Sequence, residues 1–403
     1  MSDAPVPRST YKFAVFALAI GAFGIGVTEF ATMGLLPHIA SELDITVPQA
    51  GHAVSLYALG VVVGAPLITT IAAHMDRKTL LLCLMGLFAL GNIASMLAPN
   101  AWSFNLARFV SGLPHGAYLG IGAIVAASLV PVGRRGRAMA RVMLGLTIAN
   151  IVGVPVAAAL GNAFGWRSAY ALVAALGILT VIMVAIAVPR VSLGQTPSAR
   201  GEMKALARPQ ILLTLLAGSV GFGGMFAVYT YITPTMTEVA HVPGTAIPWV
   251  LAVYGLGMTA GSLIAGPLVD KSIERSGVGG MVLSALVLSI FGAFTQIAWV
   301  AILALFFIGI SGSMITTALQ MRLLRDSTDA PSLAAAMNHA AFNLANALGA
   351  WLGGIVITAG LGYRAPAWVG VGLCLAGLVV LGIAIALRRG GPARPSRRTT
   401  LDV

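Results

Sequence analysis

Two opposite charges lie inside the long apolar runs of this sequence. Glu29 lies in the run that begins at Phe13, and Arg108 lies in the run that follows Trp102. At 1.5 Å per residue, helices that end at Pro37 and begin at Trp102 place Glu29 about 12 Å and Arg108 about 9 Å from the same end. The two side chains are therefore expected at similar depth.

These two charges allow two interpretations. An isolated charge in hydrocarbon costs at least about 3 kcal/mol, so pairing or hydration is expected. In one interpretation Glu29 and Arg108 form a structural ion pair. In the other, Glu29 carries protons and Arg108 is its counter-charge, because a carboxyl group between a dry environment and an arginine can bind a proton in one conformation and release it in another. We favour proton coupling, in which a cationic substrate would displace the proton by competing for Glu29.

A histidine follows on the same helix face. His115 lies seven residues after Arg108, two helical turns further on. Imidazole suits a proton relay near neutral pH, but histidines also join membrane helices by hydrogen bonds. We include His115 in the proton-coupling set.

Amide side chains supply further polar faces. Asn150 lies in the fifth apolar run, and His339, Asn343 and Asn346 follow one another at helical spacing in the eleventh. Such residues either contact a substrate or join neighbouring helices, and for the eleventh run we slightly favour helix contact. Asn150 and Asn343 are our amide candidates for substrate binding.

The composition is that of a membrane protein. With 403 residues, 58% hydrophobic and 9% charged, and a mean hydropathy of +0.93, the chain has too little polar material to cover a soluble globule. A spanning helix needs about 20 mainly apolar residues, and the short alternating segments of a transmembrane barrel are not seen. We predict an all-α integral membrane protein with twelve transmembrane helices, at residues 13–37, 50–73, 79–98, 102–127, 138–160, 167–188, 210–236, 247–269, 279–298, 299–323, 333–358 and 367–387.

The basic residues gather on one side of the predicted membrane. With loops assigned alternately, all of the 24 Lys and Arg residues except Arg108, Arg167 and Arg364 fall on that side. This bias follows the positive-inside rule, so we expect both termini in the cytoplasm and a net charge that orients the protein instead of binding nucleic acid. Five tryptophans fall near the opposite helix ends, as an interfacial belt would: Trp102, Trp166, Trp249, Trp299 and Trp368.

An internal repeat divides the chain. A shift of 197 residues aligns Pro37 with Pro234, both expected to end a helix, and aligns the segments 57–64 with 254–261, Gly112 with Gly309, and 165–167 with 362–364. We therefore predict two pseudo-symmetric six-helix bundles, 1–189 and 210–387, with a cytoplasmic linker at 190–209 and a basic cytoplasmic tail at 388–403. Such halves place a substrate site at their interface near the midplane, and transport by rocking follows as a hypothesis.

The repeat is asymmetric in its polar groups. Glu29, Arg108 and His115 align with Phe226, Leu305 and Gly312, so the ionisable set exists only in the first half. The second half instead carries an aromatic and Met stripe, which is typical of packing but also suits an apolar substrate: Phe222, Met225, Phe226 and Tyr229, with Tyr231 and Thr233 nearby. We expect protons to be handled by the first half and an apolar or aromatic substrate to be bound partly by the second.

Four motifs carry a family resemblance: "GPLVDK" (266–271) followed by Arg275, "TIAAHMDRKT" (70–79), "RFVSGLPHG" (108–116) and "GLTIANIVGVP" (145–155). Together they resemble the major facilitator superfamily, in its twelve-helix drug:proton antiporter branch, and specifically the arabinose-efflux-permease-like and chloramphenicol-resistance-like exporters. The first copy of the family's loop motif departs from the pattern, with Thr69 and Ala73 where Gly and Asp are expected, although Asp76 lies nearby.

The resemblance implies roles for several groups. The loop motifs imply gating residues at Arg77, Lys78, Asp270, Lys271 and Arg275. Helices 1, 4 and 7 line the central cavity in the family. The predicted substrate-binding residues are Tyr57, Asn150, Phe222, Phe226, Tyr229, Tyr231 and Asn343.

We predict a secondary active transporter that exports small amphiphilic, drug-like compounds in exchange for protons by alternating access. The alternative within transport is an exporter or facilitator of sugars, nucleosides or related metabolites. An enzyme is not expected, because no nucleophile elbow, phosphate-binding glycine loop, metal-ligand cluster or second buried carboxylate appears. A receptor or scaffold usually adds a soluble domain, whereas the loops here are short. We expect a monomer in a bacterial-type inner (plasma) membrane, without cofactor or metal.

Overall fold

The computed structural model describes residues 8–71, 75–190, 208–327 and 331–389. Within these ranges all regular structure is helical, and twelve segments are long and apolar enough to cross a membrane. The predicted fold class, an all-α membrane protein with twelve spans, is confirmed. The predicted linker and tail lie almost entirely outside the described residues, in 191–207 and 390–403.

Six spans form the first half. They are α1 (Arg8–Glu42), α2 (Val47–Ile71), α3 (Arg77–Leu97), the pair α4 (Ala101–Gly112) and α5 (His115–Ser128), the series α6 (Arg135–Ile148), η2 (Ala149–Gly153) and α7 (Val154–Phe164), and α8 (Arg167–Ala187). A short 3-10 turn, η1 (Val132–Arg134), precedes α6.

Six further spans form the second half. They are the series α10 (Pro209–Gly221), α11 (Gly223–Thr230), α12 (Ile232–Pro234) and η3 (Thr235–Val239), then η4 (Gly244–Ala246) with α13 (Ile247–Lys271), α14 (Ile273–Phe294), α15 (Ala298–Asp326), α16 (Pro331–Val356) with η5 (Ile357–Leu361), and α17 (Ala365–Arg389).

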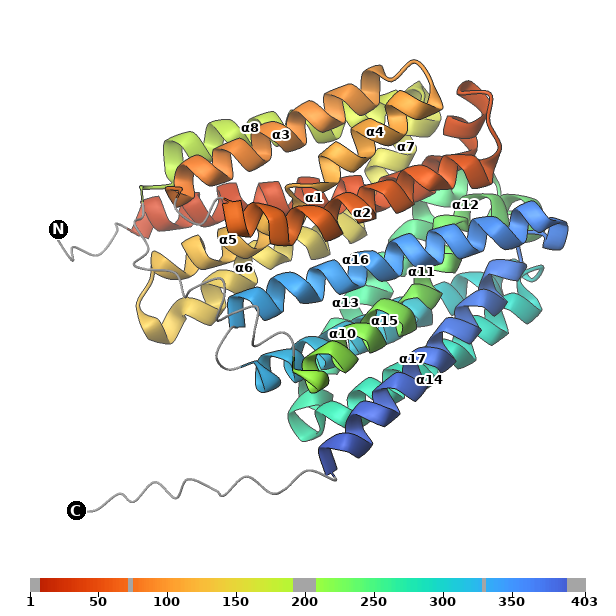
Figure 1. The fold of residues 1–403 in the computed structure, drawn as a ribbon. Coiled ribbons are helices and arrows are strands. Elements are labelled where there is room, and N and C mark those ends of the chain that lie inside the picture. Colours follow the sequence, from red (N-terminus) through yellow and green to blue (C-terminus); the bar gives the residue numbers. More distant parts are fainter. Residues whose placement is uncertain (1–7, 72–74, 191–207, 328–330, 390–403) are drawn as a thin grey trace.

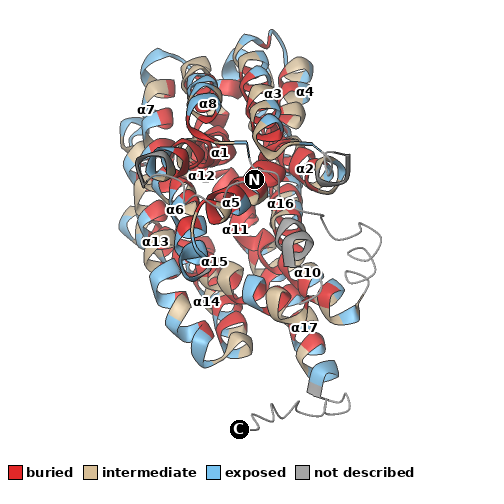
Figure 2. Cartoon of the chain, turned by 90° about the vertical axis from the view of Figure 1, so that its left-hand side faces the viewer, coloured by how far each residue is buried: buried red, intermediate tan, exposed pale blue. Residues whose placement is uncertain are grey.

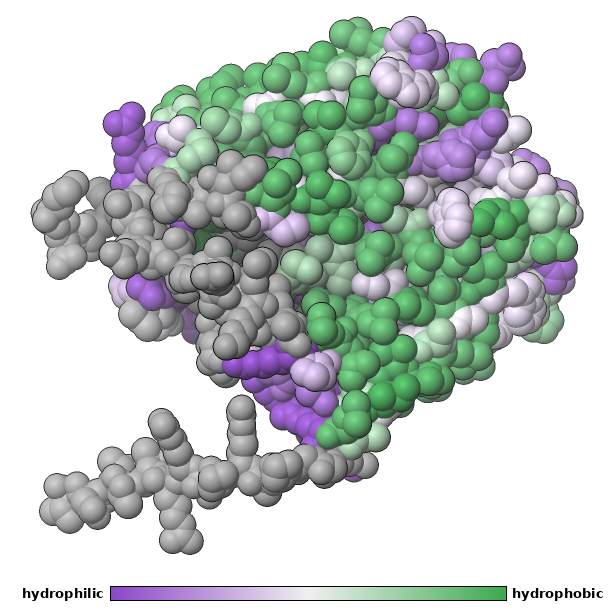
Figure 3. Space-filling model, viewed as in Figure 1, coloured by the Kyte–Doolittle hydropathy of each residue, from purple (hydrophilic) through white to green (hydrophobic). Residues whose placement is uncertain are grey.

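The two halves lie side by side with their helices roughly parallel to one axis (Figure 1). We call the end where α1 begins and α17 ends the basic end, and the other end the opposite end. Seen from the basic end, most first-half helices occupy the upper part of the molecule and most second-half helices the lower part (Figure 2). Apolar side chains cover the flank between the two ends, with hydrophilic residues gathered toward the ends (Figure 3). This surface is the one expected of a bilayer-spanning bundle.

Two local expectations were wrong. Pro37 does not end a helix, because α1 continues to Glu42; a proline removes one intrahelical hydrogen bond, and the following residues still bond within the helix. Trp166 does not face the surroundings, because its side chain is 1% exposed and packs edge-on against Phe104 and Tyr170. The other four tryptophans of the expected belt are more than half exposed.

Three spans are interrupted near prolines. Pro114 separates α4 from α5, Pro155 follows the π-helical turn η2, and Pro234 is the last residue of α12, directly before the π-helical turn η3. Proline lacks an amide hydrogen and crowds the carbonyl four residues earlier, so it displaces the hydrogen-bond ladder. Such π-turns are frequent at functional sites.

Glycines bring equivalent helices together in both halves. Gly60 of α2 packs against the carbonyl of Phe109 in α4, and Gly257 of α13 packs against the carbonyl of Phe306 in α15. A Cβ added at either position would overlap that carbonyl oxygen. The same relation holds for Gly112 against Tyr57 and for Gly309 against Tyr254, at the 197-residue offset of the repeat. The repeat found in sequence is thus a repeated close helix contact.

Gly257→Ala is expected to destabilise the protein by about 1–3 kcal/mol, because the added methyl group meets backbone that cannot move aside alone. Gly372→Ala in α17 is the matched control: an added methyl group there would meet nothing within 4 Å, so replacement of a helical glycine should be neutral or stabilising. Thermal unfolding of the detergent-purified variants measures both. Equal melting temperatures would contradict the close-contact explanation.

Candidate functional site

A cavity of about 160 Å³ lies between the two halves. Its wall combines one carboxylate, two histidines and two asparagines with a set of phenylalanines, and no Lys or Arg of the described chain lines it. The lining residues are Glu29, Phe30, His115, Leu146, Thr147, Asn150, Phe222, Phe226, Met258, Thr259, Ser262, His339, Phe342 and Asn343. Both halves therefore contribute polar and apolar groups to one chamber.

Glu29 reaches this cavity from the middle of α1. Its side chain is buried, with 8% of the residue exposed, and the described part of the chain supplies it with no hydrogen bond or ion pair. A carboxylate in such a place needs water, a proton or a ligand cation as a partner. Glu29 is therefore the free anionic or protonatable group of the chamber.

Arg108 is fully buried and lies behind the cavity wall. Its Nη1 donates to Thr28 Oγ1 at 2.8 Å and its Nη2 to the Thr28 carbonyl at 2.9 Å. The guanidinium carbon lies 4.3 Å from the ring centre of Tyr57 and 5.4 Å from that of Tyr170. Thr28 in turn donates to Asn92 on α3. In this conformation Arg108 holds the residue next to Glu29 and makes no ion pair with Glu29 itself.

His115 connects the cavity to this buried group. Its Nδ1 lies 2.9 Å from the hydroxyl of Tyr57, the residue whose ring covers Arg108. Tyr57 itself does not line the cavity. His115 therefore stands between the chamber and the aromatic partner of Arg108.

Two asparagines enter the cavity wall from different halves. Asn150 lies in η2 and donates through Nδ2 to the carbonyl of Leu146, and Asn343 lies in α16 and donates through Nδ2 to the carbonyl of His339. Both amide oxygens are buried without a hydrogen-bond partner among the described residues. His339 lies one turn before Asn343 and also lines the cavity, although sequence reasoning favoured helix contact for that run.

Aromatic rings from both halves meet beside Glu29. Phe30 of α1 stacks on Phe226 of α11, with ring centres 6.1 Å apart, and contacts Tyr229 edge-on at 5.6 Å. Phe222 contacts Phe226 at 5.3 Å and Phe342 of α16 at 5.0 Å. Phe222 and Phe226 line the cavity, whereas Tyr229 packs behind them.

Tyr231 lies away from the cavity. Its hydroxyl donates to the carbonyl of Ala350 at 2.8 Å, and its ring lies against Gly51, Gly353 and Gly354. These neighbours belong to α2 in the first half and α16 in the second. Tyr231 therefore fills the joint between the halves, and its predicted role in substrate binding has no support from this conformation.

Hydrogen bonds join the described parts of the two halves on the opposite-end side of the cavity. Thr233 Oγ1 donates to the carbonyl of Gly34 at 2.9 Å, and Asn162 Nδ2 donates to the carbonyl of Gly244 at 3.3 Å. Ser55 Oγ donates to the carbonyl of Ala347 at 3.2 Å. No hydrogen bond or ion pair links described residues of the two halves at the basic end. The described hydrogen bonds between the halves thus lie on one side of the chamber.

The predicted gating residues all lie at the basic end. Arg77 and Lys78 begin α3, and Lys78 donates to the carbonyl of Ala185 in α8, within the same half. In the second half, Asp270 and Lys271 end α13 and Arg275 lies in the first turn of α14, with all three side chains exposed. Neither set forms a bond between halves in the described structure.

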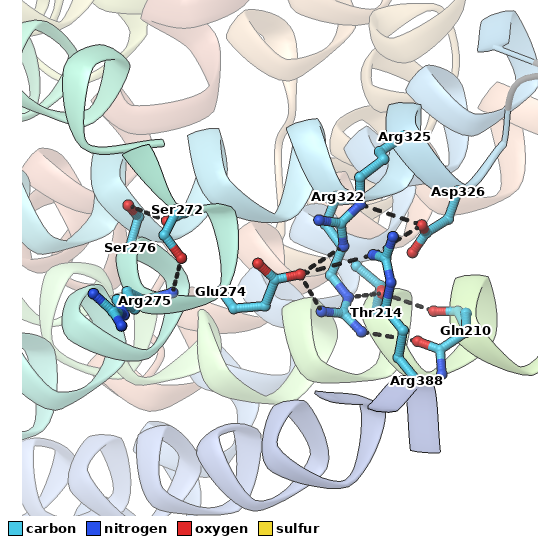
Figure 4. A network of polar contacts seen from close by, with 10 residues as sticks. All are labelled: Gln210, Thr214, Ser272, Glu274, Arg275, Ser276, Arg322, Arg325, Asp326 and Arg388. Atoms are coloured by element: carbon cyan, nitrogen blue, oxygen red, sulfur yellow. Dashed lines mark hydrogen bonds and ion pairs between the residues drawn. The ribbon is translucent and has the colours of Figure 1, made fainter. Parts of the chain in front are cut away.

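The charged cluster of the second half instead centres on Glu274, which sequence reasoning missed (Figure 4). Glu274 pairs with Arg325 at 2.8 Å and lies 3.7 Å from both Arg322 and Arg388, and Asp326 pairs with Arg388 at 3.2 Å. The cluster joins the ends of α14, α15 and α17. An acidic residue in the short loop before the predicted helix at 279–298, on the side where the arginines gather, was the available signal.

Other residues of the site were also missed. Thr28 anchors Arg108, and Thr259 and Ser262 of α13 line the cavity. Small hydroxyl residues are common in membrane helices, so their sequence positions carry little signal. Phe30, next to Glu29, was also missed, because it belongs to none of the motifs or spacings that the sequence analysis used.

Comparison with known proteins assigns the fold to a family. The family model described as Major Facilitator Superfamily matches residues 18–331 and 230–401. The inner membrane transport protein YdhP of Escherichia coli (strain K12) is 39% identical over 94% of this chain and 97% of its own length. The chloramphenicol resistance protein of Streptomyces lividans is 30% identical over 95% of this chain and 99% of its own length.

A solved structure has the same arrangement of helices. The xylose transporter XylE from E. coli, in a partially occluded inward open conformation, superposes with a TM-score of 0.72 over 93% of this chain and 98% of that one, at 17% identity. The full-length sequence match, the twelve spans and the shared fold agree: the chain is a member of the Major Facilitator Superfamily, a family of membrane transporters.

Proposed function

We propose that this protein is a proton-coupled exporter of small amphiphilic compounds, and that Glu29 carries the proton. The observation that carries the proposal is a buried carboxylate, placed in a cavity between two halves, that forms no hydrogen bond or ion pair with the described residues. A site at that interface is where alternating access by rocking halves places a substrate. The chloramphenicol resistance protein among the relatives is in keeping with drug-like cargo.

In the proposed cycle, Glu29 binds a proton and the substrate alternately. With the chamber facing the cytoplasm, Glu29 gives up its proton as a substrate enters. After the halves rock, Glu29 faces the outside, takes up a proton and releases the substrate. Arg108 supports this exchange from behind the wall, because its bonds to Thr28 keep a positive charge close to the carboxylate without neutralising it.

The second half supplies the apolar side of the site. Phe222, Phe226 and Phe342 offer ring faces to the chamber, and aromatic side chains bury large apolar areas with specific geometry. In the same scheme His115 passes protons between the chamber and the Tyr57 and Arg108 group. Arg77, Lys78, Asp270, Lys271 and Arg275 are proposed to meet across the basic end when the chamber faces outward.

The rival function is the transport of sugars, nucleosides or related metabolites. A sugar site typically presents many hydrogen-bonding side chains, and eight of the fourteen lining residues carry one. The four phenylalanines and the buried carboxylate of Glu29 in the same wall are what favour an amphiphilic compound over a sugar. We place the working protein in the inner membrane as a monomer. Its termini are proposed to be cytoplasmic, because the basic residues gather at one end.

Reconstitution into liposomes with an imposed pH gradient tests the proposed function. Amphiphilic drugs, sugars and nucleosides are screened for substrate flux that is accompanied by proton flux. We expect drug-like amphiphiles to move against their gradient at the expense of the pH gradient. Substrate flux without proton movement would establish the facilitator function instead.

Glu29→Gln should abolish gradient-driven transport, reducing it to the level of empty liposomes, because an amide cannot exchange a proton. Exchange of substrate down its own gradient should persist. Glu238→Gln, at a glutamate outside the cavity near the opposite end, is the matched control and should transport normally. Active transport by the Glu29 variant at the wild-type rate would refute its role.

Phe226→Ala should change substrate preference while leaving the proton-to-substrate ratio intact. Loss of a buried phenyl contact of roughly 1.5–3 kcal/mol predicts about a tenfold or greater fall in apparent affinity for aromatic substrates. Phe164→Ala, at a residue 77% exposed, is the control. Comparison of KM and of protons moved per substrate separates the two effects. Equal damage to both would count against the proposed division between the halves.

A further inference from the structure

Four polar side chains of the cavity wall present hydrogen-bond acceptors to it. The Nδ2 groups of Asn150 and Asn343 each donate a hydrogen bond to the carbonyl four residues earlier in their own helix. The hydroxyls of Thr259 and Ser262 likewise donate to Gly255 and Met258 carbonyls of α13. Such back-bonding consumes the donor and leaves oxygen lone pairs for a ligand.

The orientation of the two amides follows from chemistry. Each asparagine faces a backbone carbonyl, which can only accept a hydrogen bond, so the NH₂ group must point to the helix. The oxygens of Asn150 and Asn343 are therefore the atoms left without partners among the described residues. The two residues are 6% and 3% exposed and line the same chamber from opposite halves. A buried acceptor without a donor is costly, so a ligand that supplies donors gains binding energy there.

Glu29 and the phenylalanines of the wall favour a cation over a neutral polyol. Glu29 adds an acceptor with negative charge, and the wall as described has no Lys or Arg. Phe30, Phe222 and Phe226 add ring faces, which attract organic cations. A cavity of about 160 Å³ is comparable to one known to hold benzene, at roughly 150 Å³.

We propose that the cavity selects aromatic organic cations that carry at least two N–H donors, and that the amide oxygens of Asn150 and Asn343 bind these donors from the two halves at once. This inference rests on the proposed transport function and names the substrate class of that site. It separates primary and secondary ammonium or amidinium compounds from quaternary cations, which have charge but no donor. A ligand bound in this way bridges the halves.

The test uses 2-phenylethylammonium and its N-methyl, N,N-dimethyl and N,N,N-trimethyl derivatives. The ring and charge stay constant while the number of N–H donors falls from three to none. Dissociation constants are measured by ligand-observed NMR titration of the purified full-length protein. We expect the first two compounds to bind alike and the loss of the second donor to weaken binding about tenfold, as for a hydrogen bond from a charged donor.

Variants test whether the two amides cause the tenfold difference in affinity between the compounds with two or more N–H donors and the dimethyl compound, here called the donor step. Asn150→Leu and Asn343→Leu should abolish the step, so that the primary ammonium binds no better than the dimethyl compound. Asn343→Asp keeps an acceptor oxygen and adds charge, so it should retain the step with tighter binding, and it serves if a leucine variant does not fold. Asn346→Leu is the matched control, because Asn346 is equally buried in α16 but does not line the cavity; it should keep the step.

The outcomes separate this inference from the proposed function. Binding that is independent of donor number, a step that survives both leucine substitutions, or no binding of any of the four compounds would overturn the inference. Proton-coupled flux of other substrates in the liposome screen would still support the proposed function in those cases. A donor-dependent step with no proton movement would overturn proton coupling and leave the donor selectivity standing.

Discussion

The buried guanidinium of Arg108 constrains most of the first half. A charge of this kind is tolerated within a membrane only when other groups surround it. Thr28 on α1 accepts two hydrogen bonds from it, Tyr57 on α2 and Tyr170 on α8 cover it with their rings, and Thr28 passes the network on to Asn92 on α3. One side chain of α4 thereby fixes its position relative to four other helices. The location of Glu29 follows, since it is the next residue after Thr28.

The two halves share a scaffold and differ in chemistry. Close glycine contacts of α2 with α4 recur between α13 and α15 at the same sequence offset. The position of Arg108 is taken by Leu305 in the second half, whose buried arginine, Arg322, lies instead near the basic end with Glu274. Small residues preserve the packing angle whatever polar groups the helices carry. A duplicated frame can therefore hold charges at a different depth in each half.

Hydropathy and residue spacing predicted the fold, but only some of the contacts in the site. The twelve spans follow from apolar run length, which the bilayer imposes. Glu29, His115, Asn150 and Asn343 were singled out because polar groups are rare in such runs, and the structure places all four in the cavity wall. Sequence could not tell that Arg108 reaches Thr28 and not Glu29, because neighbouring helix positions differ by about 100° and a long side chain can turn to either. Tyr231 follows Tyr229 by two residues and lies after a break in the helix, so it leaves the aromatic face. Trp166 shows that a helix end can also be an interior position.

The hydrogen bonds between the halves end on backbone carbonyls, at Gly34, Gly244 and Ala347. Each is a neutral bond with a net contribution of about 1 kcal/mol. Among described residues no ion pair crosses the interface, since the salt bridges join groups within one half. These three hydrogen bonds therefore contribute only a few kcal/mol to holding the halves in the described orientation. Because these bonds are between neutral groups, added salt, which screens charges, should change the stability of this interface between the halves very little.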